Sequence, residues 1–292
     1  MSFSFAQVTA TVDVGSRLRR VRFEVPDLRR LGLPDLPDEV VGIYFPTPGR
    51  STPPEMTQVD GVWAFHDVDP APEGRTLTVR EVDHRAGTMS VDFVVHDSGP
   101  ATEWAQAARP GDQVTMAYAR GWYRPDPAAD WHLLVADLSG LPALARILGT
   151  HPRPESVTAV VEVAEHDDLE YVGFSGDTRV IPLVGSGNGL SPSVLGDAVA
   201  GLDVPAGHGY CWYAGEAAQS RAVRKHLRNV RGWDRDQYDI IGYWRAEGER
   251  WARRYAAHGD DLLAVYQRAL AAGKGEKAAA EEFDEALERA GL

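Results

Sequence analysis

The first half of the chain alternates apolar and polar residues with a period of two, which is the pattern of strands buried on one side. The strands expected from this pattern are Val21–Val25, Val40–Phe45, Arg75–Val82, Thr88–Val95 and Gln113–Tyr118. Turn-forming residues separate them, and segment 46–61, rich in Pro, Gly, Ser and Thr, is expected to be irregular. Short strands at this spacing predict an antiparallel β-barrel.

Beyond a linker at 124–130, short apolar runs alternate with segments of helical period. The runs that predict buried strands are Trp131–Ala136, Val157–Val163, Val180–Val184, Tyr210–Ala214 and Tyr238–Ile241. Helices are expected over Leu141–Leu148, over Pro192–Ala200 with Ser191 as cap, and over Ala217–Val230. This succession of strands and helices predicts an α/β fold with a doubly wound parallel sheet.

The last part of the chain has helical spacing and charges of alternating sign. Its apolar positions Leu262, Leu263, Val265, Tyr266 and Leu270 imply a helix face that packs against the body of the protein or a second subunit. The whole pattern predicts a β-barrel domain over 1–125, an α/β domain over 130–245 and a helical C-terminal extension over 246–292.

Composition narrows the classes of function. The net charge of −13 and the pI of about 5.1 make nucleic acid a poor partner. The single cysteine, Cys211, excludes an internal disulfide and a four-cysteine iron–sulfur cluster, and the spacing of the nine histidines indicates no metal site. The sequence shows no signal peptide and no apolar run of membrane-spanning length, so we expect a cytoplasmic protein without membrane insertion. The oligomeric state stays open.

Three segments of the barrel suit an anionic, aromatic cofactor. They are Arg75–Arg80, Asp92–His96 and Gly99–Ala105. Two arginines on one strand can bind phosphate oxygens, and the Gly-Pro-Ala-Thr sequence opens a helix whose first N–H groups can bind an anion. Two arginines on a strand are more often solvated charges, so the ordered combination of segments is what favours a cofactor.

The order and spacing of these segments resemble the siderophore-interacting protein family, a branch of the ferredoxin-reductase-like flavoproteins whose first motif reads Arg-x-Tyr-Thr/Ser-x-Arg. The resemblance runs from about Val21 to Arg245. The second half adds three similar segments, which are Ala136–Ala143, Trp212–Ala217 and Gly242–Arg245. Ala136–Ala143 is similar to the family's Gly-Asp-Glu-Thr-x-x-Pro-Ala turn, with Leu138 and Ser139 in place of Glu and Thr.

The resemblance implies an FAD site in the barrel. Its residues would be Arg75, Leu77, Thr78, Arg80, Asp92, His96, Ala101 and Thr102. Arg75 would bind the diphosphate, Thr78 would approach the flavin ring, and Ala101 and Thr102 would hold phosphates through backbone and hydroxyl. A buried core position is an equal alternative for His96. Leu77 stands where the family has the tyrosine that stacks on the ring.

The resemblance also implies NADPH or NADH on the α/β domain, beside Asp137, Ser139, Gly215, Glu216 and Trp244. Gly215 would let the backbone approach the cofactor. Glu162 and Glu165 would favour the free ribose hydroxyl of NADH. Arg221, Arg224 and Lys225 would favour the phosphate of NADPH, and the choice stays open.

The function implied by the resemblance is reduction of ferric siderophores, in which the nicotinamide passes a hydride to the flavin and the flavin passes electrons to iron(III). The ferric siderophore is then the expected substrate. No acid–base or nucleophilic catalytic residue is needed, and the sequence contains no catalytic triad or carboxylate pair. The alternatives are a flavin-linked reductase with another acceptor and a siderophore- or flavin-binding protein without catalysis. The glycine-rich segment 185–189 lacks the Lys-Ser/Thr of a P-loop, and we interpret it as a flexible connection.

Overall fold

The structure is a computed structural model, and it describes residues 2–47, 50, 52–66, 68–96, 99–256 and 259–292. The chain divides into two compact units, 1–243 and 244–292. Each unit is described by itself below.

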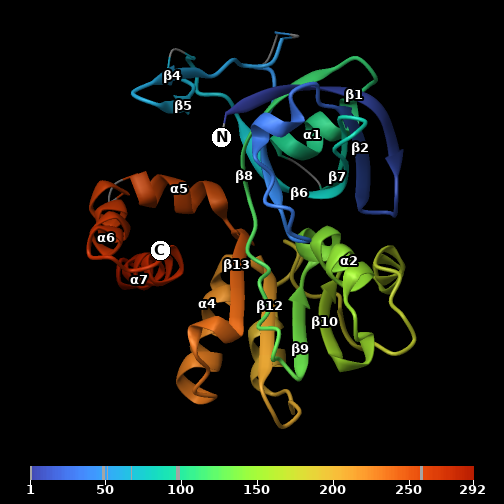
Figure 1. Ribbon diagram of the computed structural model, residues 1–292, viewed down its shortest axis with the longest axis vertical. Helices are drawn as coiled ribbons and strands as arrows, with labels where there is room; N and C mark the ends of the chain where they lie inside the picture. The colour runs from blue at the N-terminus through green and yellow to red at the C-terminus, as the bar shows by residue number, and fades with distance from the viewer. Residues whose placement is uncertain (1, 48–49, 51, 67, 97–98, 257–258) are drawn as a thin grey trace. The chain divides into compact units, whose positions relative to one another are not determined.

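The first unit begins with the expected antiparallel barrel (Figure 1). Its strands are β1 Phe3–Asp13, β2 Leu18–Glu24, β3 Val40–Tyr44, β6 Gly74–Asp83, β7 Thr88–Val94 and β8 Gln113–Arg120. They close in the order β1-β2-β7-β6-β3-β8. Helix α1, Pro100–Ala107, follows β7. Trp104 of α1 lies with its ring centroid 5.1 Å from that of Phe45 and 5.6 Å from that of Phe93, which anchors the helix on the barrel core.

Strand β1 and a short hairpin were not expected from the sequence. The buried residues of β1 include Ser4, Ala6 and Val8, which are too small or too polar to give a strong apolar alternation. The hairpin joins β4, Thr57–Val59, to β5, Val62–Ala64, within the predicted irregular region. Its turn places Asp60 and Gly61 at φ 49° and 82°, as a tight hairpin turn requires.

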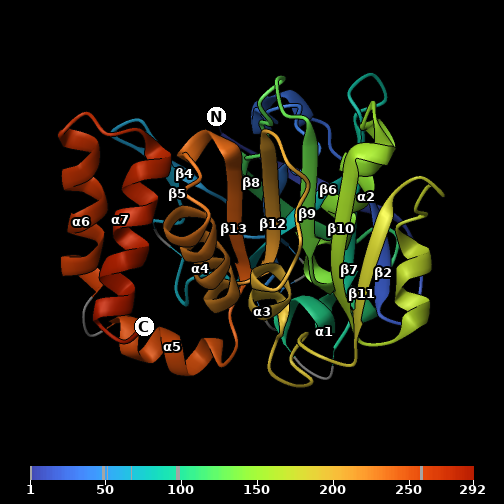
Figure 2. The ribbon, with the colours of Figure 1, turned by 90° about the horizontal axis from the view of Figure 1, so that it is seen from below.

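The five-stranded sheet of the first unit has the order β11-β10-β9-β12-β13, and its β9, β10, β11 and β12 pairings are parallel (Figure 2). The strands are β9 Trp131–Ala136, β10 Val157–Val163, β11 Arg179–Val184, β12 Gly209–Glu216 and β13 Tyr238–Trp244. Leu134 and Ala136 share a buried cluster with α2, Leu141–Thr150. Leu133 and Val135 share another cluster with α3 and α4, so helices cover both faces and the predicted doubly wound sheet is confirmed.

Two helices differ in extent from the prediction. Helix α3 is Leu195–Ala200 and begins three residues after Pro192, and the N–H of its N-cap residue Val194 donates to the buried Glu162 carboxylate at 2.7 Å. Helix α4 ends at Lys225 and continues as a single π-helical turn. The short helical turns are η1 Leu28–Leu31, η2 Leu138–Gly140, η3 Pro154–Ser156, η4 His166–Tyr171, η5 His226–Val230 and η6 Arg235–Gln237.

A buried carboxylate fixes the barrel against the sheet. Asp38, which precedes β3, accepts hydrogen bonds from the N–H groups of Trp122 and Tyr123 at 2.9 and 2.8 Å and from the indole N–H of Trp212 at 3.0 Å. Burial raises the pKa of Asp38 above its ordinary value, against these hydrogen bonds. The adjacent Glu39 pairs with Arg146 of α2 at 3.1 Å. These bonds set how the barrel and the sheet face one another.

The second unit consists of three helices, α5 Gly248–Ala256, α6 Gly259–Ala271 and α7 Glu276–Arg289. They have a core of their own, which consists of Leu262, Ala286, Leu287 and Leu292 with Trp251, Tyr255, Val265 and Phe283. The predicted apolar face of α6 is therefore partly satisfied within the unit, by Leu262 and Val265. Leu263 and Leu270 stay 44 and 37% exposed.

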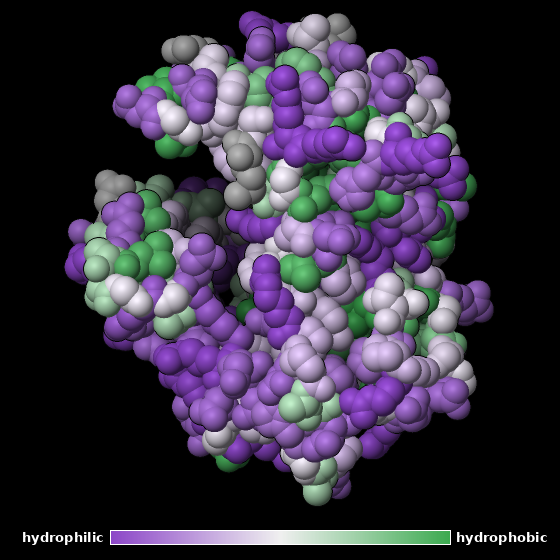
Figure 3. Space-filling view, in the orientation of Figure 1, coloured by the Kyte–Doolittle hydropathy of each residue, from purple (hydrophilic) through white to green (hydrophobic). Residues whose placement is uncertain are grey.

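Two general features concern the surface. The face seen in Figure 3 is mostly hydrophilic, with small and separate hydrophobic areas. Across the described residues, every helix is too short or too polar to cross a bilayer.

Candidate functional site

Leu77 and Thr78, two of the predicted flavin residues, lie in the first half of β6. Because side chains alternate along a strand, they point to opposite faces of it. Leu77 packs against the barrel core, as Ala101 and Trp104 also do, whereas Thr78 lies on the opposite face of the strand. The Thr78 side chain is buried, and its hydroxyl faces the hydroxyl of Tyr243. Arg75 is exposed, and its guanidinium donates to the neighbouring carbonyl of Gly74 at 2.8 Å. A hydroxyl can make more than one hydrogen bond, and buried hydrogen-bonding capacity is usually used, so a polar ligand group beside Thr78 fits.

Tyr243, at the end of β13, carries a second buried hydroxyl; the sequence pointed to it as one of an aromatic pair with Trp244 but did not assign it to the cofactor site. Burial, with Asp38 nearby, raises its pKa, while a hydrogen bond with Thr78 and the charges of Arg120 and Arg146 lower it, so the Tyr243 and Thr78 hydroxyls are hydrogen-bonding neighbours. Trp244 follows directly and begins the second unit, so its role beside a cofactor stays a prediction. The Gly-Tyr-Trp-Arg segment was the signal in the sequence, but the prediction assigned the cofactor contact to Trp244 and not to Tyr243.

Helix α1 presents an N-terminus without a side-chain cap among the described residues. Gly99 precedes it at φ 125°, a conformation that favours glycine. The first-turn N–H groups, those of Ala101 and Thr102 included, therefore suit an anion. The Thr102 hydroxyl is engaged elsewhere, since it donates to the Val94 carbonyl at 3.3 Å and accepts from the His96 N–H at 3.4 Å. Only the backbone of Thr102 is left for the predicted phosphate contact.

His96 is exposed at the end of β7, which rules out the alternative of a buried core histidine. A Cβ at Gly99 would lie 3.2 Å from its ring, so the ring covers the approach to α1. Residues 97 and 98, between them, lie outside the described part of the chain. His96 thus lies beside the helix N-terminus, and its predicted place near the cofactor stays a prediction.

Asp92 and Arg80 belong to a polar cluster between the barrel and the sheet. Arg20 donates two hydrogen bonds to the Asp92 carboxylate, at 2.7 and 2.8 Å, and the hydroxyl of Tyr171 donates to the same group. Burial of Tyr171, with Asp92 beside it, raises the pKa of that phenol. The Arg80 guanidinium lies 5.9 Å from the centre of the Tyr171 ring. Asp92 is thus committed to Arg20 and Tyr171, while the buried Nε of Arg80 has no partner among the described residues.

In the turn after β9, which was predicted to contact the nicotinamide cofactor, the N–H groups of Leu138 and Ser139 already donate to acceptors within the chain. Asp137 accepts from the Ser139 N–H at 2.9 Å, and Asn188 accepts from the Leu138 N–H at 2.9 Å. Glu216 caps α4 by accepting from two N–H groups, at 2.6 and 3.0 Å. A Cβ at Gly215 would lie 2.8 Å from the Asp137 carboxylate, so this glycine makes room for Asp137. The N–H groups of this turn offer no open anion site.

Segment 185–189 also makes specific contacts, which differs from a simple flexible connection. Ser186 donates to the buried Glu162 carboxylate at 2.9 Å, and the Asn188 amide donates to the Glu162 and Ser186 carbonyls. Gly187 adopts φ 63°, and a Cβ there would overlap the second Glu162 oxygen. Segment 185–189 therefore covers the Glu162 carboxylate, one oxygen of which accepts hydrogen bonds from Ser186 and Val194.

Three acidic residues, Asp137, Glu162 and Glu216, meet at the carboxyl edge of the sheet. Burial raises the pKa of Tyr213, and all three acids add to the shift, so they surround this phenol. Ligands of doubly wound folds bind at such an edge, but these charges disfavour a diphosphate. Glu165, the other acid expected to select NADH, pairs with Arg17 at 3.1 Å. The geometry gives no support to a nicotinamide phosphate at these residues.

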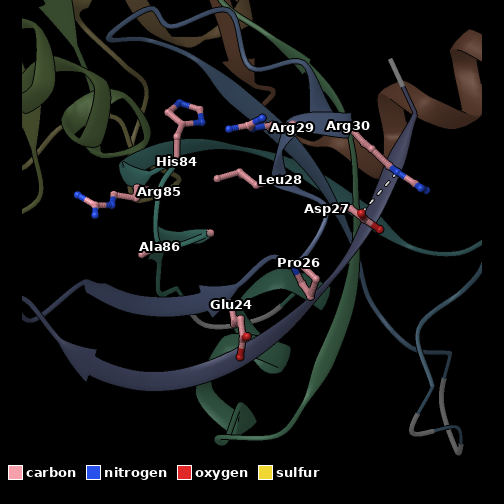
Figure 4. A pocket seen from close by; sticks show the side chains of 10 residues that line it. Glu24, Pro26, Asp27, Leu28, Arg29, Arg30, His84, Arg85 and Ala86 are labelled. Atoms are coloured by element: carbon pink, nitrogen blue, oxygen red, sulfur yellow. Dashed lines mark ion pairs between the residues drawn. The ribbon is translucent and has the colours of Figure 1, made fainter.

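A surface pocket of about 340 Å³ lies elsewhere on the barrel, between η1 and the β6–β7 turn (Figure 4). Arg29 extends toward His84, and Arg30 pairs with Asp27 at 3.5 Å. The pocket follows the far end of β6, roughly 30 Å along the strand from Arg75 at about 3.3 Å per residue. The residues that line this pocket include none of the predicted cofactor residues. Within the described residues, His, Cys, Asp and Glu form no group that could hold a metal ion.

Comparisons with known proteins agree with this architecture. A family model described as the siderophore-interacting FAD-binding domain matches residues 7–122, and one described as siderophore-interacting protein matches residues 129–247. A solved structure of a siderophore utilization protein from T. fusca has a TM-score of 0.70 at 29% identity, over 83% of this chain and 92% of that one.

Two relatives have names that state an activity. The ferric vibriobactin reductase ViuB of Vibrio cholerae is 33% identical over 63% of this chain and 67% of its own length. The NADPH-dependent ferric-chelate reductase of Escherichia coli is 28% identical over 72% of this chain and 80% of its own length. The barrel, the sheet and these matches together show that the chain belongs to the siderophore-interacting protein family and carries the FAD-binding domain of that family.

Proposed function

We propose that this protein is an FAD-dependent reductase of ferric siderophores that takes its electrons from NADPH or NADH. The observation that carries the proposal is the buried Thr78 hydroxyl, which neighbours the Tyr243 hydroxyl and keeps capacity for a further hydrogen bond, on the same strand as the exposed Arg75. These groups lie in the part of the chain that matches an FAD-binding family. The reductase names of two relatives support the reaction.

Each barrel residue has a proposed role that follows from its position. Arg75 and the backbone of Ala101 and Thr102 bind the diphosphate, because a guanidinium and first-turn N–H groups are the anion donors present. Thr78 donates or accepts one hydrogen bond at the flavin ring. Leu77 covers a ring face with an aliphatic side chain, without the stacking that a tyrosine gives. Asp92 acts indirectly, since it holds Arg20 and Tyr171 in place.

FAD, when bound, would supply the electrons that convert iron(III) to iron(II). Oxygen ligands of siderophores hold iron(III) far more tightly than iron(II), so reduction releases the metal. The chain then has to bind and orient the reactants, and the proton that the hydride would leave behind, once two electrons had passed to two iron(III) ions, could go to water without a catalytic acid or base. This agrees with a site of hydrogen-bond donors and apolar cover. NADPH or NADH is proposed as donor on the strength of the Escherichia coli relative, and no residue of the acidic sheet edge is assigned to it.

The test is a spectrum followed by turnover. Purified protein reconstituted with FAD should show flavin absorption, which anaerobic NADPH or NADH should bleach. Adding a ferric siderophore with an iron(II) trap should then restore the flavin absorption and yield trapped iron(II). Protein that takes up no FAD would exclude the proposed function.

Arg75→Ala is expected to weaken FAD binding by about 1.5–3 kcal/mol, the range of a hydrogen bond to a charged group. Equilibrium dialysis or flavin fluorescence measures the dissociation constant. Arg22→Ala is the matched control, since Arg22 is also an exposed arginine on a barrel strand but lies outside the predicted site. Equal FAD affinity in both variants would remove Arg75 from the site.

A second candidate is a siderophore- or flavin-binding protein without turnover. Two observations favour it, namely the self-satisfied turn at Leu138 and Ser139 and the leucine at position 77. The experiment above separates the two functions. A binding protein takes up FAD or the siderophore but produces no iron(II) with either nicotinamide.

A further inference from the structure

An aromatic shelf, which consists of Tyr44, Phe65 and Tyr118, lies on the outside of the barrel. The ring centroids of Tyr44 and Phe65 are 4.7 Å apart, and those of Tyr44 and Tyr118 are 6.2 Å apart. Tyr44 and Tyr118 alternate with the core residues Ile43, Phe45 and Ala119, so they face outward. Tyr118 is 44% exposed, and the shelf presents open ring surface.

The chain holds these rings in place with unusual local structure. Gly42 and Gly74 lie against the Tyr44 ring, and a Cβ at Gly74 would overlap it. Tyr118 adopts φ 56° within β8, a conformation that side chains other than glycine rarely adopt. Its hydroxyl donates to the Trp63 carbonyl at 2.8 Å, which ties the ring to the β4–β5 hairpin. The positive φ belongs to a β-bulge, because Tyr118 and Ala119 of β8 together lie opposite Val41 of β3, and a bulge of this kind re-aims a side chain.

Positive charge borders the shelf. Arg120 is exposed, and among the described residues no carboxylate lies within ion-pairing distance of it. Its guanidinium lies 5.5 Å from the Trp122 ring centre and 3.5 Å from the Thr76 hydroxyl. Burial raises the pKa of the Tyr44 phenol, and the positive charge of Arg120 lowers it, so Arg120 lies close enough to act on a ligand at the shelf. In a chain of net charge −13, this patch suits an anion that carries aromatic rings.

The shelf adjoins the predicted flavin strand. Tyr44 pairs with Gly74, and Gly74, Thr76 and Thr78 alternate along the outer face of β6. Arg75 follows Gly74 directly. A ligand on the shelf therefore lies on the same face of β6 as Thr78, which we propose for the flavin ring.

We propose that the aromatic shelf selects ferric siderophores whose iron ligands are aromatic, catecholates or phenolates, over siderophores with hydroxamate ligands; this rests on the proposed function. A tris-catecholate complex of iron(III) is anionic and presents planar rings, which stack on tyrosine and phenylalanine and attract Arg120. A hydroxamate ligand offers no ring to stack. The shelf thus sets the substrate class, while the flavin residues set the reaction.

The test uses complexes of gallium(III), which has nearly the size of iron(III) but is not reduced. The probes are a gallium(III) tris-catecholate of a 2,3-dihydroxybenzoyl ligand and a gallium(III) linear trihydroxamate, and calorimetry measures their binding to FAD-loaded protein. The tris-catecholate should bind at least about tenfold more tightly. Tyr118→Gly removes the ring and relieves the backbone strain, so it should fold. It should weaken tris-catecholate binding by about three- to tenfold and leave trihydroxamate and FAD binding unchanged.

Asp60→Gly is the matched control, because Asp60 is also exposed at positive φ but carries no ring. It should bind both probes like the wild type. Equal affinity of the wild type for both probes, or unchanged tris-catecholate binding in Tyr118→Gly, would overturn the proposal. Lost FAD binding in Tyr118→Gly would also overturn it, since the shelf would then belong to the flavin. Failure of the proposed function differs, because selective gallium binding would persist while the iron(III) complexes stay unreduced.

Discussion

Asp38→Ala is expected to lower the free energy of unfolding by about 3–5 kcal/mol. The substitution leaves the N–H groups of Trp122 and Tyr123 and the indole N–H of Trp212 without an acceptor inside the protein. Because burial already raises the pKa of Asp38, the stabilisation comes from these three hydrogen bonds rather than from the charge itself. Urea unfolding, followed by tryptophan fluorescence, measures the loss.

Asp27→Ala is the control for the loss of an aspartate. Asp27 is exposed and makes an ion pair with Arg30 at 3.5 Å, so its replacement should change stability by at most about 0.5 kcal/mol. A loss as small in Asp38→Ala would show that the carboxylate does not fix the barrel against the sheet. The contact between barrel and sheet is relevant to the proposed function, because Thr78 of the barrel and Tyr243 of the sheet are neighbours there.

The sequence was most informative where a strand is buried on both faces. β9 and β10 begin and end at the predicted residues, because each is a nearly continuous apolar run between polar turns. β1 was missed because its core-facing positions include Ser4 and Ala6. The hairpin β4–β5 was missed because turn-forming residues dominate its surroundings, and its strands contain three residues each.

The same distinction applies to the candidate site: short motifs could be recognised in the sequence, and contacts between distant residues could not. Arg75, Thr78 and the α1 N-terminus could be assigned to a flavin site from the sequence because they belong to short motifs along the chain, and that assignment stays a prediction. The contacts that close the sheet edge could not be predicted, because they join residues far apart in sequence. Asn188 accepts from the Leu138 N–H across 50 positions, and Arg17 pairs with Glu165 across 148. Tyr171 reaches Asp92 in the same manner, and only the fold brings these pairs together.

Stability should fall as the pH drops from about 6.5 to about 4, because of His132. This histidine on β9 is buried, and its Nδ1 has no hydrogen-bond partner among the described residues. Burial, then His151 and Arg153, lower the pKa of His132 from 6.5 to about 4. The unfolded chain binds the proton below 6.5 and the folded chain does so only near 4, so the folded state loses stability between these values. Above pH 6.5 the full stability is present.

The expected loss from His132 across this range is roughly 3 kcal/mol, at about 1.36 kcal/mol for each unit of pKa. His132→Leu keeps a side chain of similar size and removes the titration. Urea unfolding of both proteins from pH 4 to 8 gives the comparison, and the difference at pH 8, where position 132 is uncharged in both, gives the packing cost of leucine. The gap should move in favour of the variant as the pH falls. A gap that stays constant from pH 8 to 4 would mean that the folded protein accommodates a charged His132, and that the contact with His151, with ring centroids 4.5 Å apart, opens without cost.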